Sequence, residues 1–325
     1  MALPFDLKNA IENELDGLKS SELVSVSKMI TDKYGSDSAC GNKKLSRAIE
    51  TKVYAAVRMP ATFGAVSSCL EYITDIMPDF SPRTMLDIGA GTGAGTWAAY
   101  QMFNLEQITC LEREDEMRVL GSHLMECDSE LSKCTEWIKK DVILDNFDKK
   151  ADFVLSSYML NEIPENVLLK VVDKLVEATN DTLLIVEPGT VKGYSILMTV
   201  REYLINKGLN IIAPCPHIEK CRLADDDWCH FSCRVARSKI HKVIKEADVP
   251  YEDEKFMYLA ISKTDSNKKP DNLNRIVRHP FIAKGQITLD ICSADGNKKT
   301  LYRKKDGLIY KKVKKLKWGD CFTED

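Results

Sequence analysis

The stretch Leu86-Asp-Ile-Gly-Ala-Gly-Thr-Gly-Ala-Gly-Thr-Trp97 decides the predicted fold. The apolar run before it predicts a short buried strand, which leads directly into a glycine-rich turn and then into a helix. Glycine lets the backbone approach a ligand closely, and the helix N-terminus behind the turn favours negative charge. The turn indicates a cofactor site, although Gly-x-Gly-x-Gly alone is a weak signal and a loop that binds nothing is the alternative.

Two acids strengthen this interpretation. Glu112 ends the second predicted strand, nineteen residues after Gly93, where a carboxylate can accept hydrogen bonds from both ribose hydroxyls. Asp141 follows Trp137-Ile138 at the end of the third strand, where it can hold an adenine amine. A dinucleotide is the usual ligand of such a turn, but Asp87 in front of the glycines favours a different one.

The pattern Asp-x-Gly-x-Gly-x-Gly, followed by acids that end the next two strands, resembles the S-adenosylmethionine site of class I methyltransferases. The resemblance covers about Arg83 to Ser262. It implies that Gly89, Gly91 and Gly93 line the methionine and ribose side, with Asp87 before them, Glu112 on the ribose and Asp141 on the adenine.

Short apolar runs alternate with amphipathic stretches after Thr84, which predicts an α/β protein with a Rossmann-like parallel sheet covered on both faces. The other predicted strands are Ile108 to Leu111, Phe153 to Leu155, Thr182 to Val186 and Phe256 to Ile261, and the helices include Ile196 to Lys207 and Ile240 to Ala247. Three parts are expected: a helical N-terminal region, 1–80, with a break at Pro60; a cofactor-binding domain, 81–265, which contains a cysteine-rich loop, 213–235; and a basic C-terminal β module, 266–325.

The cysteine-rich loop indicates a metal site. Cys215, Cys221, Cys229 and Cys233 fall within nineteen residues of polar sequence. Thiolates select zinc, copper(I) or iron–sulfur clusters, and gaps of five, seven and three residues fit iron–sulfur ligation better than the paired spacing of structural zinc. Zinc, inert thiols and disulfides stay as alternatives. The isolated cysteines are expected to be small buried hydrophobes: Cys40, Cys69, Cys110, Cys127 and Cys134.

Charge is segregated along the chain. Ten Lys or Arg and a single acid lie between Lys298 and Lys317, a net charge of +9, so that the rest of the chain carries −12. Such segregation favours nucleic-acid contact, although a charge run is often only a solvated face. Interleaved apolar residues and the Asp306-Gly307 pair predict a basic β-hairpin. Its candidate RNA-binding residues are Lys304, Lys305, Lys311, Lys312, Lys314 and Lys315.

The chain as a whole resembles the methyltransferase-like proteins of the mitochondrial ribosomal small subunit and their bacterial homologues. The matching segments are Arg58-Met-Pro-Ala-Thr62, Leu86-Asp-Ile-Gly-Ala-Gly-Thr-Gly93, Leu160-Asn-Glu162, Val186-Glu-Pro-Gly-Thr190, Ala213-Pro-Cys-Pro-His217, Trp228-Cys-His-Phe231, Tyr251-Glu-Asp-Glu-Lys-Phe256, Cys292 before Asp295-Gly296, and Trp318-Gly-Asp320. The resemblance implies bound S-adenosylmethionine, a 4Fe-4S cluster and association with small-subunit ribosomal RNA.

The resemblance also implies the cluster ligands Cys215, Cys221, Cys229 and the distant Cys292. Cys233 is an alternative fourth ligand because we expect it one helical turn beyond Cys229. Such a cluster ties two separated segments together, which couples metal binding to local folding.

Methyl transfer needs a nucleophile held in line with the methyl group. Amino-methylating enzymes of this fold commonly carry an acid or Asn, two prolines and an aromatic after the fourth strand, and the prolines are missing here. The candidates near the methyl group are Tyr158, Asn161 and Glu187. We therefore expect a ribosomal RNA methyltransferase or, alternatively, a non-catalytic small-subunit assembly factor with S-adenosylmethionine as a structural ligand; a small-molecule methyltransferase with structural zinc is a third possibility.

The composition is that of an ordinary globular protein, 44% hydrophobic and 29% charged, without an apolar run long enough for a bilayer. The acidic first eighteen residues resemble neither a secretory signal nor an Arg-rich transit peptide. We therefore expect a cytoplasmic, bacterial-type chain that contacts no membrane and is monomeric off the ribosome.

Overall fold

The computed structural model describes residues 1–35, 47–223, 226–264, 269–270 and 272–324. These form two compact units, which are described separately. The first unit holds residues 1–68, 81–186 and 233–254, and the second holds 69–80, 187–232 and 255–325. In the described part of the chain, every helix is too short or too polar to cross a membrane. The three-part division expected from the sequence stays a prediction.

The N-terminal region is helical, as expected, and comprises α1 (Phe5–Glu14), α2 (Ser20–Gly35) and α3 (Ala48–Thr74). The predicted break at Pro60 is wrong, because α3 continues through this residue. Proline removes one backbone hydrogen bond, which costs about 3 kcal/mol in a helix interior. Its neighbours Met59 and Ala61 are almost fully buried, and burial of this kind offsets that cost.

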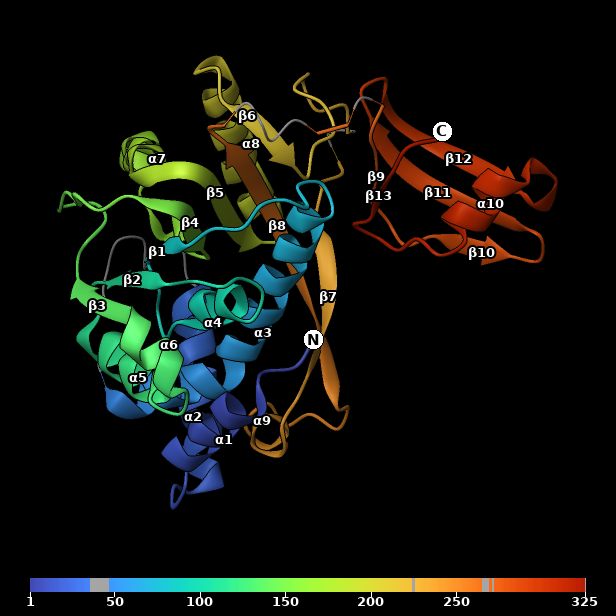
Figure 1. Ribbon diagram of the computed structural model, residues 1–325. Coiled ribbons are helices and arrows are strands. Elements are labelled where there is room, and N and C mark those ends of the chain that lie inside the picture. Colours follow the sequence, from blue (N-terminus) through green and yellow to red (C-terminus); the bar gives the residue numbers. More distant parts are fainter. Residues whose placement is uncertain (36–46, 224–225, 265–268, 271, 325) are drawn as a thin grey trace. The chain divides into compact units, whose positions relative to one another are not determined.

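Five strands of the main sheet pair in parallel: β1 (Thr84–Ile88), β2 (Gln107–Glu112), β3 (Thr135–Lys139), β4 (Ala151–Ser157) and β5 (Thr179–Pro188). The helices between them are α4 (Ala94–Tyr100), α5 (Asp115–Met125), α6 (Ser129–Cys134) and α7 (Glu165–Ala178). Figure 1 shows β1 beside β2 and β4. The central strands are buried along their length, as continuous apolar runs predict.

The strand order β3-β2-β1-β4-β5-β8-β6 is that of a Rossmann-like methyltransferase fold, which confirms the predicted fold class. The remaining elements are α8 (Val191–Asn206), β6 (Asn210–Ala213), β7 (Phe231–Ala236), α9 (Lys239–Ile244) and β8 (Tyr251–Ser262). However, β6 runs antiparallel to β8, so the expectation of an all-parallel sheet is wrong. The sequence could not give this direction because an apolar run such as Phe256 to Ile261 marks burial equally well either way.

The C-terminal module is a second sheet with the order β10-β11-β9-β13, and β12 pairs with β11. Its strands are β9 (Asn274–Ile276), β10 (Phe281–Ala283), β11 (Gln286–Ser293), β12 (Gly296–Arg303) and β13 (Cys321–Phe322). Figure 1 shows β11 and β12 as long neighbouring strands in red. One face of β11 is buried through Ile287, Leu289 and Ile291.

The predicted basic hairpin across Asp306-Gly307 is wrong. The chain instead forms a 3-10 turn, η3 (Lys304–Asp306), and a short helix, α10 (Leu308–Val313). Ile309, Val313 and Leu316 recur at helical spacing and pack on the module's core. The true hairpin joins β11 to β12, where Ser293 pairs with Gly296.

Candidate functional site: a cofactor cleft and a cysteine cavity

A cleft in the first unit lies at the carboxyl ends of β1, β2 and β4. It encloses about 1080 Å³, including its open mouth, and is lined by the β1–α4 loop, the ends of β2 and β4, and α3. Ligands of open α/β sheets bind at this edge.

The glycine loop needs its glycines for two reasons. Gly89, Gly91 and Gly93 have φ values of 76°, 57° and 83°, which disfavour residues with a Cβ. A Cβ on Gly89 would also lie 2.8 Å from Cγ of Met159, and one on Gly93 would lie 2.7 Å from Cε of Met125. Gly89 and Gly91 line the cleft, whereas Gly93 does not line it and is the N-cap residue of α4.

Glu112 joins the glycine loop to the second strand. Its carboxylate accepts hydrogen bonds from the backbone N–H of Gly91 at 2.8 Å and of Glu114 at 2.8 Å. Burial raises the pKa of Glu112. The side chain lines the cleft, where its predicted contact with ribose hydroxyls stays a prediction.

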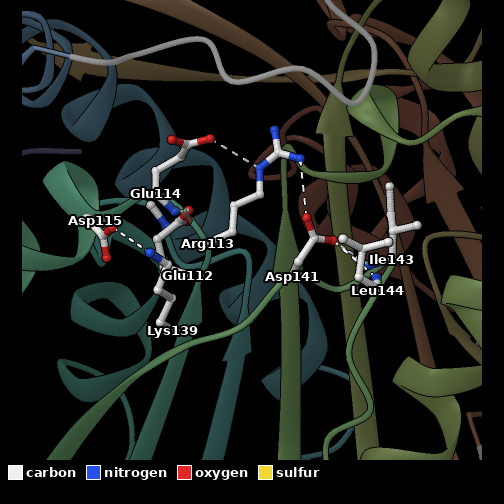
Figure 2. A network of polar contacts seen from close by, with 9 residues as sticks. Glu112, Arg113, Glu114, Asp115, Lys139, Asp141, Ile143 and Leu144 are labelled. Carbon is white, nitrogen blue, oxygen red and sulfur yellow. Dashed lines mark hydrogen bonds and ion pairs between the residues drawn. The ribbon is translucent and has the colours of Figure 1, made fainter.

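Asp141 does not line the cleft, although its neighbours Lys140 and Val142 do. Its carboxylate caps its own turn by accepting from the backbone N–H of Ile143 at 2.8 Å. Figure 2 shows Arg113 between Asp141 and Glu114, at 3.9 and 3.3 Å respectively. The adenine contact of Asp141 therefore stays a prediction, and Arg113 is a cleft-lining residue that the sequence did not single out.

Asp87 lies beneath the loop and is fully buried. Its Oδ2 accepts a hydrogen bond from the Thr96 hydroxyl at 2.8 Å, whereas Oδ1 has no partner in the described part of the chain. Burial raises the pKa of Asp87 to about 7. Asp87 does not line the cleft, so it can act on a ligand only through the loop above it.

Tyr158 is the only one of the three catalytic candidates that lines the cleft in the described structure. Its hydroxyl donates to Oε1 of Glu254 at 2.8 Å, and both Glu254 oxygens accept from the Arg58 guanidinium, at 3.1 and 3.3 Å. Burial raises the pKa of Tyr158 well above its ordinary value. The hydroxyl is thus a fixed donor and is poorly placed to act as a base.

The other two candidates are placed differently. Asn161 lies in the 3-10 helix η2 (Leu160–Glu162), where Glu162 lines the cleft and Asn161 does not. Glu187 is fully buried and belongs to the second unit. Sequence reasoning also missed Tyr54 and Thr62 of α3 as lining residues; the motif from Arg58 to Thr62 was the available signal.

A cavity in the second unit brings Cys215, Cys221, Cys229 and Cys292 together. Its space, including the open mouth, is about 430 Å³, and its other lining residues include Tyr194 and His217. Three of the cysteines come from the segment between β6 and β7, and Cys292 comes from β11. The structure therefore gathers the four cysteines that the resemblance implied.

The thiols are spread around the cavity. Among the described residues, no three or more His, Cys, Asp or Glu side chains lie close enough to hold a metal ion. Instead, Cys221 Sγ lies 3.5 Å from the Tyr194 hydroxyl and Cys292 Sγ lies 3.6 Å from Nε2 of His217. Burial raises the pKa of Cys215 and Cys229, and raises that of Cys292 to about 12. Without a metal, these thiols are protonated.

Cys233 does not line this cavity. It lies in strand β7 of the first unit, not one helical turn beyond Cys229 as expected, and its sulfur is 3.3 Å from the position a Cβ would take on Gly64. Extended backbone carries successive side chains to opposite faces. The geometry gives Cys233 a packing role.

The isolated cysteines follow the expectation only in part. Cys69 and Cys110 are buried, whereas Cys134 is half-buried. Cys127 is exposed, so the expectation of a buried thiol is wrong for Cys127. Cys40 lies outside the described residues.

The six candidate RNA-binding lysines are all exposed. They lie in η3, in α10 and just after it: Lys304, Lys305, Lys311, Lys312, Lys314 and Lys315. Lys312 Nζ donates to the carbonyl of Thr323 at 2.7 Å. Since Val313 turns into the module's core, α10 presents its lysines to solvent.

Comparison with known proteins identifies relatives over most of the chain. A family model described as mitochondrial small ribosomal subunit Rsm22 matches residues 48–323. The human mitochondrial ribosome assembly protein METTL17 is 28% identical over 289 residues, which cover 82% of this chain and 61% of that protein. The mitochondrial Rsm22-cox11 tandem protein 2 of Schizosaccharomyces pombe is 22% identical over 318 residues, covering 81% and 42%. The chain thus spans about three fifths and two fifths of these relatives.

Solved methyltransferases are similar to parts of the chain. The magnesium protoporphyrin IX methyltransferase of Synechocystis with bound SAM has a TM-score of 0.42 and 11% identity, over 74% of this chain and 97% of that one. The ribosomal protein L11 methylase of Lactobacillus delbrueckii has a TM-score of 0.38 and 16% identity, over 61% and 77%.

Proposed function

The chain belongs to the Rsm22 family of the mitochondrial small ribosomal subunit, and from this premise we propose that it is a small-subunit assembly factor that binds S-adenosylmethionine and a 4Fe-4S cluster. The observation that best supports the proposal is that one chain contains two separate candidate binding sites. One is the glycine-loop cleft, and the other is the cavity lined by four cysteines. Its cytoplasmic location and monomeric state stay predictions.

S-adenosylmethionine is the cofactor that fits the cleft. The glycine loop lets the backbone come close to a ligand, and the buried acid Glu112 supplies a carboxylate at the edge where nucleosides bind in open α/β sheets. When bound, the cofactor would supply an electrophilic methyl group. Tyr158, anchored on Glu254, would hold the wall of the cleft beside it.

Gly91→Arg is expected to weaken S-adenosylmethionine binding at least about tenfold, because a side chain at φ 57° strains the loop and fills the cleft. Isothermal titration calorimetry measures this on the full chain. The matched control is Gly285→Arg, which places the same side chain at φ 75° in open space of the second unit. Equal affinity of the Gly91 variant and wild type would count against the cofactor assignment.

The cluster is favoured over zinc by the spacing of the cysteines in the sequence. Structural zinc sites favour closely paired ligands, whereas Cys215, Cys221 and Cys229 are separated by five and seven residues and Cys292 lies far along the chain. Iron–sulfur ligation accepts such irregular spacing and a remote last cysteine. Iron and sulfide analysis of anaerobically purified protein tests this, with stoichiometric zinc as the contrary result.

Methyl transfer is a separate proposal. The Tyr158 hydroxyl is engaged with Glu254, and this favours a cofactor held for structure over one used in each turnover. An assay of labelled methyl transfer to immature small-subunit RNA distinguishes an RNA methyltransferase from a non-catalytic assembly factor. Labelling of small molecules alone would favour a small-molecule methyltransferase.

The basic segment is proposed to bind ribosomal RNA through phosphates. Replacing Lys311, Lys312, Lys314 and Lys315 with Glu is expected to weaken RNA binding and to lower the slope of log K against log salt by up to about 3, because each phosphate contact contributes about 0.7–0.9. Filter binding across a salt series measures the slope. The quadruple Lys→Arg variant keeps the charge and should keep the slope; a slope unchanged by the Glu variant would reject this surface.

A further inference from the structure

Three cationic side chains donate hydrogen bonds to backbone carbonyls in and beside the segment that carries Cys215, between residues 211 and 219. Arg201 of α8 donates through Nη2 to the carbonyls of His217 at 2.8 Å and Glu219 at 3.0 Å. Lys269 donates through Nζ to the carbonyls of Ile211 and Cys215, both at 3.0 Å.

Arg275 of β9 is the third cation. It donates through Nε to the carbonyl of Pro214 at 3.0 Å and through Nη1 to that of Gly319 at 2.5 Å. Each of the three cations thus fixes the path of the chain beside Cys215.

The burial of these cations costs free energy. Arg201 is 3% exposed and Arg275 is 1% exposed. Within the described ranges, none of the three cations forms an ion pair with a carboxylate, and the described lining of the cysteine cavity contains no Asp or Glu. Burying an unpaired charge costs several kcal/mol. Carbonyl dipoles, and for Arg275 the Tyr72 ring whose centroid is 5.6 Å away, compensate part of this cost.

Two N–H groups of these arginines are also unsatisfied. Nε of Arg201 and Nη2 of Arg275 are buried without a hydrogen-bond partner among the described residues. A buried, unmet donor destabilises by about 1–3 kcal/mol. An acceptor or negative charge beside these N–H groups would therefore stabilise the arrangement.

The cations lie beside the cysteines themselves. Arg275 lines the cysteine cavity, and Lys269 donates to the carbonyl of Cys215.

We propose that Arg201, Lys269 and Arg275 form a cationic cage that retains an anionic four-thiolate metal centre and sets its reduction potential. Four thiolates on an oxidised 4Fe-4S core carry a net charge of about −2, and one-electron reduction makes it about −3. The cage stabilises the reduced form more, which raises the potential. This inference rests on the proposed cluster but concerns residues that do not ligate it.

The test is an anaerobic redox titration of the full chain, followed by electron paramagnetic resonance. Arg201→Gln and Arg275→Gln are expected to shift the midpoint to more negative potential, and Arg201→Lys to restore it. Lys269→Met, at a less buried position, provides a third variant in case an arginine variant fails to fold. Arg303→Gln, an exposed arginine of the same unit, is the matched control and should leave the midpoint unchanged.

The outcomes separate the inference from the proposed function. Variants that hold full iron at an unchanged midpoint overturn the cage. If wild type carries zinc, the cluster proposal fails, and the cage then predicts at least about tenfold faster zinc release to a chelator from Arg201→Gln, with equal release overturning it. Metal-free wild type overturns both.

Discussion

Cys292→Ser is expected to abolish binding of the proposed cluster in the cysteine cavity and to expose the segment between β6 and β7 to proteolysis. Cys292 comes from β11, whereas the other three cysteines come from one segment, so its loss would break the proposed metal-mediated tie between two parts of the second unit. Structural metal sites contribute on the order of 10 kcal/mol to folding. Iron content and limited proteolysis after anaerobic purification measure the effect.

Cys233→Ser is the matched control for this experiment. Its thiol packs against Gly64 and does not line the cavity, so the variant should keep its iron and its cleavage pattern. Loss of iron in the Cys233 variant together with retention in the Cys292 variant would reverse the ligand assignment.

Asp87→Asn is expected to remove one contribution to the pH dependence of the free energy of unfolding, so that wild type loses stability relative to the variant as pH rises from about 5 to about 7. Burial raises the pKa of Asp87 from 3.8 to about 7. Between these values the native state keeps a proton that the unfolded chain has lost, so each pH unit of increase costs about 1.4 kcal/mol. Above about pH 7 both states are ionised, and the penalty is constant at on the order of 4 kcal/mol.

Urea unfolding without cofactor, at several pH values, measures this difference. Asparagine can still accept the Thr96 hydrogen bond through its amide oxygen. Asp148→Asn removes an exposed carboxyl of the same unit and serves as the control. Parallel pH profiles for wild type and Asp87→Asn would show that the carboxyl is not held protonated.

The main sheet was predictable because buried strands and glycine turns leave local signals. The run before Gly89 and the acid at position 112 both lie where the pattern places them. The direction of β8 was not predictable, since it depends on pairing with a distant strand. Nor was the helix after Gly307, because its short apolar repeat between lysines fits a strand as well as a helix turn.

In the candidate sites, too, residues with a local sequence signal could be predicted, whereas those that depend on distant packing could not. Spacing marked the cysteines as metal ligands, but only the family resemblance singled out Cys292. Nothing local to Arg201 or Arg275 in the sequence distinguishes them from surface arginines, because their burial depends on packing between remote segments. The partner of Tyr158, Glu254, is likewise ninety-six residues away.

The origin of the fourth cysteine on β11 sets an order of events during synthesis. Cys292 leaves the ribosome sixty-three residues after Cys229, which at about 5–20 residues per second is a delay of roughly 3–13 s. During this delay, Cys215, Cys221 and Cys229 of the nascent chain are already synthesised, whereas Cys292 is not. The lysines of α10 are synthesised only after Cys292, so all four proposed cluster ligands exist before the segment that is proposed to contact RNA.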